Sequence, residues 1–211
     1  MRILQVLSDA TNVIAEGEVQ QLINTHDASL DEAGYLHVIR SKTAKLFEAS
    51  TQIAAILAGA NARVEAACAT YGQALGTAFQ IIDDVLDYDG DATEMGKNLG
   101  DDLREGKCTL PLIIAMQRAT PEDAQVVREA IEQGSTEQLP SILSIVKRTG
   151  ALDATREAAH NEAMRAIAAL QALPVNAYTQ AMEQLAAQPS FQRAEASKGH
   201  NIFDRMKSFF R

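Results

Sequence analysis

Acidic and basic residues alternate in the middle of the chain at spacings that suit phosphate chemistry. The stretch begins with Asp83, Asp84 and Asp87 and ends with two lysines, Lys97 and Lys107, each of which follows a glycine. On a helix, Asp83 and Asp87 share a face and Asp84 stands beside them. Three carboxylates at that spacing repel, and Mg2+ relieves the repulsion while it keeps positions for water and phosphate oxygens. The pattern predicts a magnesium site that grips a diphosphate, with lysines holding the remaining phosphate charge.

The position of the three aspartates favours this interpretation over a solvated acidic surface. Apolar periodicity predicts a helix from residue 62 to about residue 87, so the acids lie at its C-terminal end. The helix dipole disfavours negative charge there, which suggests a compensating cation. For the lysines, ordinary surface solvation stays open as the alternative, although a preceding glycine lets the backbone approach an anion.

Two other phosphate or cation motifs fail on spacing. A P-loop needs four residues between its glycines, whereas Gly100 and Gly106 are separated by five. A calcium loop that started at Asp87 would have Ala92 in place of its glycine and Asn98 in place of its bidentate glutamate. Both motifs are therefore rejected.

The composition of the chain argues against several classes of binding partner. The 211 residues carry a formal charge of -9 and no basic cluster over most of the chain, which argues against nucleic acid. Cys68 and Cys108 are isolated, with no histidine at zinc-site spacing, and suit a reducing compartment. No apolar run approaches the roughly 20 residues that span a bilayer. We therefore expect a cytoplasmic protein.

The elements that must position these residues are all predicted to be helical. A capping box at Ser29-Leu30-Asp31-Glu32 starts a helix that runs to residue 59 and places Lys42 and Thr43 in its middle. Periodicity, prolines and glycines predict further helices over residues 3–22, 62–87, 110–118, 121–133, 137–149, 152–172 and 175–187. Residues 88–109 are expected to form a long functional loop. An antiparallel all-α bundle is the expected fold.

These motifs together resemble a known family. DDVLD at residues 83–87, Lys42-Thr43, GKNLGDDL at 96–103 and EGKCTLP at 105–111 resemble the second half of the trans-polyprenyl diphosphate synthases, and most resemble the bacterial octaprenyl diphosphate synthases within that family. The resemblance implies the isoprenoid synthase type of all-α bundle, incomplete at its N-terminal side. It covers a domain of residues 1–188.

The resemblance also implies roles for individual residues. Asp83 and Asp87 would face the cavity and bind Mg2+, with Asp84 as a further ligand or a support, while Asp101 and Asp102 would act on the metal through water. The residues implied to hold the substrate diphosphate are Lys42, Thr43, Gln80, Lys97 and Lys107, of which the first four would serve catalysis directly. An ordinary surface role stays open for Gln80.

The implied activity is a prenyl transfer. A member of this family couples an allylic diphosphate with isopentenyl diphosphate, repeatedly, to give a long-chain polyprenyl diphosphate for a quinone side chain. The family uses two aspartate-rich motifs, and this chain contains only the second. We therefore expect it to be inactive alone, and to form a homodimer or to associate with the missing half. The alternative is a non-catalytic helical subunit that dimerises with a complete synthase and regulates it.

Residues 189–211 depart from the family. A polar linker leads to an amphipathic pattern formed by Ile202, Phe203, Met206, Phe209 and Phe210. The pattern is typical of a short helix on a membrane surface or a partner. Packing of this tail against the rest of the chain is the favoured alternative.

Overall fold

The protein consists of helices over the residues that its computed structural model describes, 1–89 and 99–188. The elements are α1 (Arg2–Ile23), α2 (Glu32–Ile39), the π-helical turn η1 (Arg40–Ala44), α3 (Lys45–Leu57), α4 (Ala62–Asp89), α6 (Asp101–Arg104), α7 (Leu110–Arg118), α8 (Pro121–Gln133), α9 (Leu139–Arg148), α10 (Ala151–Ala169), the 3-10 turn η2 (Leu170–Ala172) and α11 (Ala177–Ala186). No strand occurs within the described ranges. The all-α prediction is confirmed.

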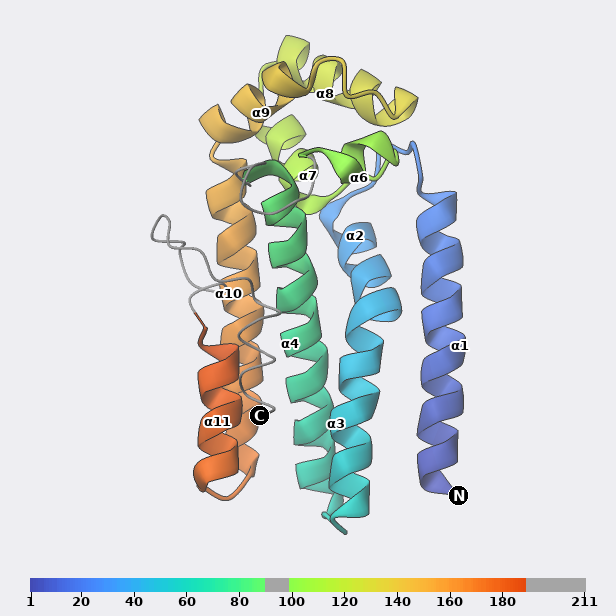
Figure 1. Ribbon diagram of the computed structural model, residues 1–211, viewed down its shortest axis with the longest axis vertical. Coiled ribbons are helices and arrows are strands. Elements are labelled where there is room, and N and C mark those ends of the chain that lie inside the picture. Colours follow the sequence, from blue (N-terminus) through green and yellow to red (C-terminus); the bar gives the residue numbers. More distant parts are fainter. Residues whose placement is uncertain (90–98, 189–211) are drawn as a thin grey trace.

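The long helices run up and down beside one another (Figure 1). The central helix α4 packs most extensively against α3 on one side and α10 on the other. Helices α8 and α9 lie across the end of the bundle where α4 terminates, and α6 and α7 lie beneath them (Figure 1). The antiparallel bundle predicted from the sequence is confirmed, and the end of α4 that carries the aspartates lies under a helical cover.

Local signals explain why most helices begin and end where they do. Helix α7 spans the predicted residues, with a proline in its first turn where a missing N–H costs no hydrogen bond. Thr120 caps α8 by accepting from the amide of Asp123, and Gly134 ends it with φ 60°, which a glycine adopts without strain. The long loop expected after residue 88 contains the short helix α6, while residues 90–98 lie outside the described part of the chain.

The predicted helix over residues 29–59 needs two corrections. Its cap is Asp31, whose carboxylate accepts from the amide of Gly34 at 2.8 Å, and the hydroxyl of Ser29 donates to Asp27 instead. The helix is also interrupted by η1, which carries Lys42 and Thr43 on a wider turn. Such π turns often mark functional sites, and periodicity alone does not reveal them.

Glycines on two neighbouring helices let η1 sit where it does. A Cβ on Gly17 of α1 would lie 2.7 Å from the backbone nitrogen of Lys42, and one on Gly76 of α4 would lie 2.8 Å from the Cα of Ala44. A Cβ atom at either position would clash, because the opposing atoms belong to the backbone and cannot move aside easily. The π turn η1 thus packs closely against α1 on one side and α4 on the other.

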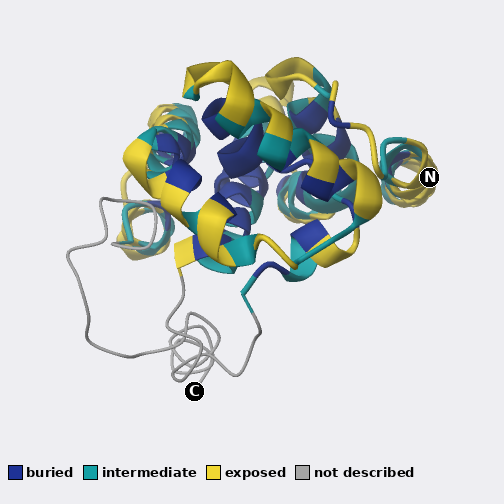
Figure 2. Ribbon diagram, turned by 90° about the horizontal axis from the view of Figure 1, so that it is seen from above, coloured by how far each residue is buried: buried dark blue, intermediate teal, exposed yellow. Residues whose placement is uncertain are grey.

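Helix α1 lies at the edge of the bundle, with much of its surface exposed (Figure 2). Leu4, Leu7, Val19 and Leu22 are 45–74% exposed, whereas Ala10 and Gly17 on its inner face are buried. A helix that is apolar on two sides is typical of one that packs between partners. In the described part of the chain, no helix combines the length and apolar content that crossing a membrane requires.

Candidate functional site

The last turns of α4 gather a buried hydrogen-bond network around Asp84. This side chain is only 3% exposed, and its two oxygens accept from the Tyr35 hydroxyl at 2.6 Å and from the Gln80 amide nitrogen at 2.8 Å. The oxygen of Gln80 in turn accepts from the Thr43 hydroxyl at 3.0 Å. Four side chains from α2, η1 and α4 are thereby joined in one chain of hydrogen bonds.

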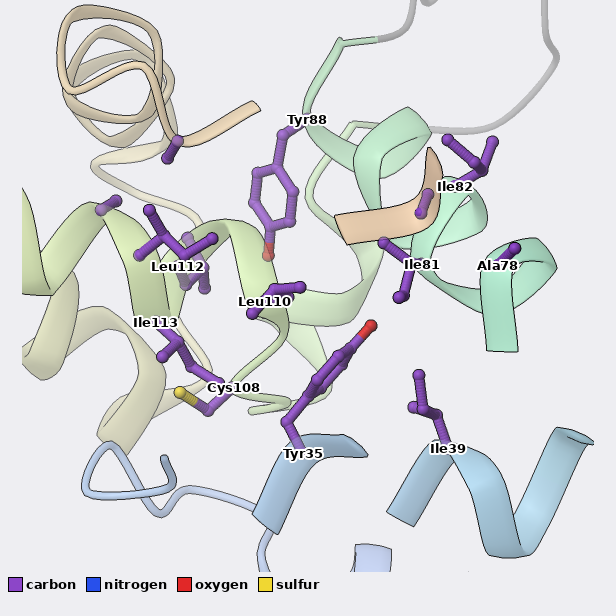
Figure 3. Packing of buried hydrophobic residues seen from close by; sticks show 14 of the residues in the cluster. Tyr35, Ile39, Ala78, Ile81, Ile82, Tyr88, Cys108, Leu110, Leu112 and Ile113 are labelled. Atoms are coloured by element: carbon purple, nitrogen blue, oxygen red, sulfur yellow. The ribbon is translucent and has the colours of Figure 1, made fainter. Parts of the chain in front are cut away.

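Tyr35 anchors this network in the hydrophobic core. It is 3% exposed, and Figure 3 shows its ring rising from α2 among buried residues, with the hydroxyl at the end distant from that helix. Ile39, Cys108 and Leu110 belong to the same core cluster. Burial and the charge of Asp84 raise the pKa of the Tyr35 hydroxyl well above its ordinary value, so the hydroxyl stays protonated and donates.

Asp87 joins α4 to α6. Its two carboxylate oxygens accept from the backbone amides of Asp101 and Asp102, each at 3.1 Å. Those amides are among the unpaired donors at the start of a helix, and a carboxylate satisfies them. Asp101 and Asp102 are thus held beside Asp87 by their backbone, although the side chain of Asp101 pairs with Arg104.

Lys42 and Lys107 already have hydrogen-bond and ion-pair partners within the chain. Lys107 lies 3.1 Å from Asp102 and 2.6 Å from Glu105. Burial alone would lower the pKa of Lys107, but the hydrogen bonds and charges of these two carboxylates outweigh it and raise the pKa. Lys42 donates to the side-chain oxygen of Gln21 and lies 3.9 Å from Glu18. An anion that used these lysines would compete with the present partners.

A small pocket of about 60 Å3 opens between these elements. Five predicted site residues line it: Lys42, Gln80, Asp84, Asp102 and Lys107. Its other walls come from the end of α1, from α2 and from the start of α7. Thr43 reaches the pocket only through Gln80, and Asp83 and Asp87 are not among the lining residues. Lys97 lies outside the described residues.

The site carries an excess of negative charge, and the pKa values of its acids reflect it. Burial, followed by the charge of Asp102, raises the pKa of Asp84 from 3.8 to about 7. The same two causes, reduced by the bonds from the α6 amides, raise the pKa of Asp87 to about 6. Both carboxylates are harder to ionise than usual because burial and a neighbouring negative charge disfavour the ionised form. A cation that entered here would restore their charge.

The donor set fits a metal only in part. Within residues 1–89 and 99–188, no three His, Cys, Asp or Glu side chains converge as a ready-made metal centre. Mg2+ does not require one, since it commonly takes one or two carboxylates and completes its shell with water and phosphate oxygens. Asp87 and the neighbouring Asp83 supply oxygen ligands of that kind, so the chemistry of the donors agrees with a metal held jointly with a substrate.

Sequence reasoning missed Tyr35, Gly17 and Gly76. The small residues Gly72 and Gly76 at i and i+4 on α4 were a signal of close helix packing, and a Cβ on Gly72 would lie 2.4 Å from the Phe47 carbonyl oxygen. Tyr35 gave no comparable signal, because its partner lies 49 residues further along the chain.

Comparisons with known proteins agree with this architecture. An all-α bundle of this form is the fold of the isoprenyl diphosphate synthases, to which its structural neighbours belong. The polyprenyl synthase of Caulobacter crescentus, solved with calcium and isoprenyl diphosphate, superposes with a TM-score of 0.85 at 43% identity, over 92% of this chain and 60% of that one.

The sequence matches the family model "Polyprenyl synthetase" over residues 1–146, and the chain therefore belongs to that family. It is 51% identical over 187 residues to octaprenyl diphosphate synthase of Escherichia coli K12, an alignment that covers 88% of this chain and 58% of that protein. All-trans-nonaprenyl-diphosphate synthase of Rhodobacter capsulatus is 47% identical over 185 residues and is covered to 57%. The chain thus spans less than two thirds of these relatives, and corresponds to their C-terminal part.

Proposed function

We propose that this chain forms the allylic-diphosphate end of a prenyltransferase site. The reaction adds isopentenyl diphosphate units to an allylic diphosphate and yields a long-chain polyprenyl diphosphate, the precursor of a quinone side chain. One observation carries the proposal: a pocket lined by Lys42, Gln80 and Lys107 is also lined by Asp84, whose pKa is raised by burial and by the charge of Asp102, in a chain of the polyprenyl synthetase family.

Asp83 and Asp87 would hold Mg2+, with Asp101 and Asp102 acting through water. The bound metal would supply positive charge to the departing diphosphate, which is the main electrostatic demand of ionising an allylic C–O bond. The raised pKa of Asp87 supports this role, since burial and the charge of Asp102 disfavour its ionised form and a bound cation would favour it.

Lys42, Lys97, Lys107 and Gln80 would bind the diphosphate oxygens, and Thr43 would act on the diphosphate through its hydrogen bond to Gln80. Lys42 and Lys107 line the pocket and would exchange their present carboxylate and amide partners for the more highly charged phosphate. Gln80 would donate an N–H from the pocket wall.

We infer that this polypeptide is inactive alone, because it contains only one aspartate-rich motif. The exposed leucines of α1 favour a second candidate function: a helical subunit, self-associating or bound to a complete synthase, that covers them and regulates the partner. Both candidates retain the diphosphate pocket, and they differ in whether the chain turns over substrate by itself.

The test has two parts. Calorimetric titration of the purified chain with inorganic pyrophosphate, with and without Mg2+, should give metal-dependent binding, and its absence would overturn the proposal. Incubation with isopentenyl diphosphate and farnesyl diphosphate should give no polyprenyl product from the chain alone. Product formation by the chain alone would contradict the inferred inactivity and leave the binding site intact.

A further inference from the structure

We propose that Asp84, anchored by Tyr35, is a positioning residue that orients the Gln80 amide so that one N–H faces the pocket. This inference rests on the proposed function, because it states how the same site presents a donor to a diphosphate. It separates Asp84 from the metal-binding acids beside it. It also adds Tyr35, which no sequence motif indicated, to the residues that shape the site.

The hydrogen bonds fix which way Gln80 points. A carboxylate oxygen accepts and does not donate in its ionised form, so the atom of Gln80 that lies 2.8 Å from Asp84 must be the amide nitrogen. The amide oxygen then lies toward Thr43, whose hydroxyl donates to it at 3.0 Å. A reversed amide would set its oxygen against the carboxylate and its nitrogen against the hydroxyl proton. Asp84 therefore selects one of two orientations.

The selected orientation leaves one donor for a ligand. Of the two N–H groups of Gln80, one is used by Asp84, and the other has no partner among the residues that the structure describes. Gln80 lines the pocket, so this N–H is available to a phosphate oxygen. Thr43 has one hydroxyl proton and commits it to Gln80. Gln80, rather than Thr43, is thus the donor that this network prepares for an anion.

Asp84 itself has little capacity left for a metal. Asp87 also has both oxygens engaged, but it is only partly buried, whereas Asp84 is 3% exposed and its oxygens accept from two packed side chains. Tyr35 is buried to the same degree, with its ring fixed in the core cluster. A hydroxyl held by a packed ring makes a rigid anchor, because the ring cannot follow the carboxylate if it turns.

Three variants test the inference, and a fourth serves as a matched control. Tyr35→Phe and Asp84→Leu each break the anchor. Asp84→Asn keeps it, because the asparagine oxygen accepts from Gln80 while its amide donates to the Tyr35 hydroxyl. The control is Tyr71→Phe: Tyr71 is 2% exposed, and its hydroxyl donates to the carbonyl of Met182 at 2.9 Å, outside the pocket. Like Tyr35→Phe, it loses one hydrogen bond from a buried tyrosine hydroxyl, here to a backbone carbonyl.

The first readout needs no ligand. In 15N-edited NMR spectra, the side-chain amide of Gln80, assigned by its loss in Gln80→Glu, should show two well-separated protons that exchange slowly. Tyr35→Phe and Asp84→Leu should narrow that separation and speed the exchange, while Asp84→Asn and Tyr71→Phe should preserve both. Unchanged Gln80 signals in Tyr35→Phe would overturn the inference, whether or not the protein binds diphosphate.

The second readout is the affinity for inorganic pyrophosphate with Mg2+. Loss of one prepared hydrogen bond should weaken binding about tenfold in Tyr35→Phe and Asp84→Leu, with Asp84→Asn within about threefold of wild type. A loss in Asp84→Asn as large as that in Asp84→Leu would show that Asp84 acts through its charge, and would overturn the positioning role. If wild-type protein binds no pyrophosphate, the proposed function fails, and the NMR result alone decides this inference.

Discussion

Two buried acids on α4 have hydrogen-bond partners of different charge. Glu65, near the start of the helix, is 7% exposed and accepts from Arg2 at 2.6 and 2.7 Å and from Gln52 at 3.0 Å. Asp84, near the other end, is 3% exposed, and within the described residues its partners are the neutral side chains of Tyr35 and Gln80. One acid is matched by a cation, and the other is not.

The pKa values follow from that difference. The hydrogen bonds from Gln52 and Arg2 lower the pKa of Glu65, whereas burial and the charge of Asp102 raise that of Asp84 to about 7. The first acid helps to hold the N-terminal residues of α1 to the bundle. The second costs stability when it ionises, and proteins retain such costs where function needs them. The pocket lies at the end of α4 where, within the described residues, the buried acid has no cationic hydrogen-bond partner.

The largest effect should come from removing the charges that a metal would meet. Asp83→Asn combined with Asp87→Asn keeps the size of both side chains, and the amide oxygen introduced at position 87 can still accept a bond from an α6 amide. Loss of the outer partners of a metal ligand costs up to about 100-fold in affinity, so we expect at least about 100-fold weaker Mg2+-dependent pyrophosphate binding. Calorimetric titration measures this loss.

The matched control for that experiment is Glu65→Gln, which neutralises a buried acid at the balanced end of the same helix. We expect its pyrophosphate affinity to stay within about twofold of wild type, since Glu65 is not among the residues that line the pocket. Equal losses in the two variants would mean that net charge, rather than the position of the acids, governs binding, and the contrast between the two ends would lose its meaning.

Much of the architecture could be predicted from the sequence because its signals are local. Pro111 and Gly134 mark helix ends by fixed backbone preferences, and Thr120 caps a helix three residues from its partner. The π turn at residues 40–44 could not be predicted in this way. It depends on the close approach of Gly17 and Gly76 from other helices, which periodicity within one segment does not report.

The sequence indicated the acidic cluster of the candidate site, but not the contacts that each of its members makes. The spacing of Asp83, Asp84 and Asp87 identified the acidic cluster, yet it did not reveal that Asp84 turns inward to Tyr35 while Asp87 binds the start of α6. Those roles depend on partners 14 to 49 residues away. The pairing of Glu65 with Arg2 across 63 residues was hidden for the same reason.

The second effect is on stability as a function of pH. Because the pKa of Asp84 is raised from 3.8 to about 7 on folding, the folded state holds this proton more tightly, and the stability that this gives is lost as pH rises from about 4 to about 7. Asp84→Asn should therefore match wild type below pH 4 and become more stable as pH rises through 7. We expect a gain of at least about 1 kcal/mol at pH 8, measured by urea denaturation without Mg2+.

The same comparison with Mg2+ and pyrophosphate present supplies the control. If an external cation compensates the acids at this end of α4, the ligands should stabilise wild type more than Asp84→Asn, and the advantage of the variant should shrink. A variant that is less stable than wild type at pH 8 would show that the Tyr35 and Gln80 bonds outweigh the cost of burying the charge.

Neutralising Glu65 should change the folding stability in the opposite direction, and by a smaller amount. Its lowered pKa means that the ionised form stabilises the folded state above pH about 4.5 and that this stability disappears as pH falls below it. Glu65→Gln should thus be less stable than wild type at pH 7 and indistinguishable at pH 3. Because the Arg2 side chain is 69% exposed, added salt should reduce the difference, and denaturation at low and high salt measures it.

The smallest effect is expected at Asp102, and it tests why the pKa values of Asp84 and Asp87 are raised. Asp102 is the largest charge contribution to the raised pKa values of both Asp84 and Asp87, after burial. Asp102→Asn should lower both pKa values, because one repelling charge is gone while burial is unchanged, and carboxyl 13C NMR titration would follow each group. Lys107 retains Glu105 at 2.6 Å, so the variant removes one charge without releasing the lysine. If neither pKa moves, the charge of Asp102 does not cause the raised pKa values. Burial of the carboxyl group, which removes it from water, would then explain why the pKa of Asp84 is raised while that of Glu65 is lowered.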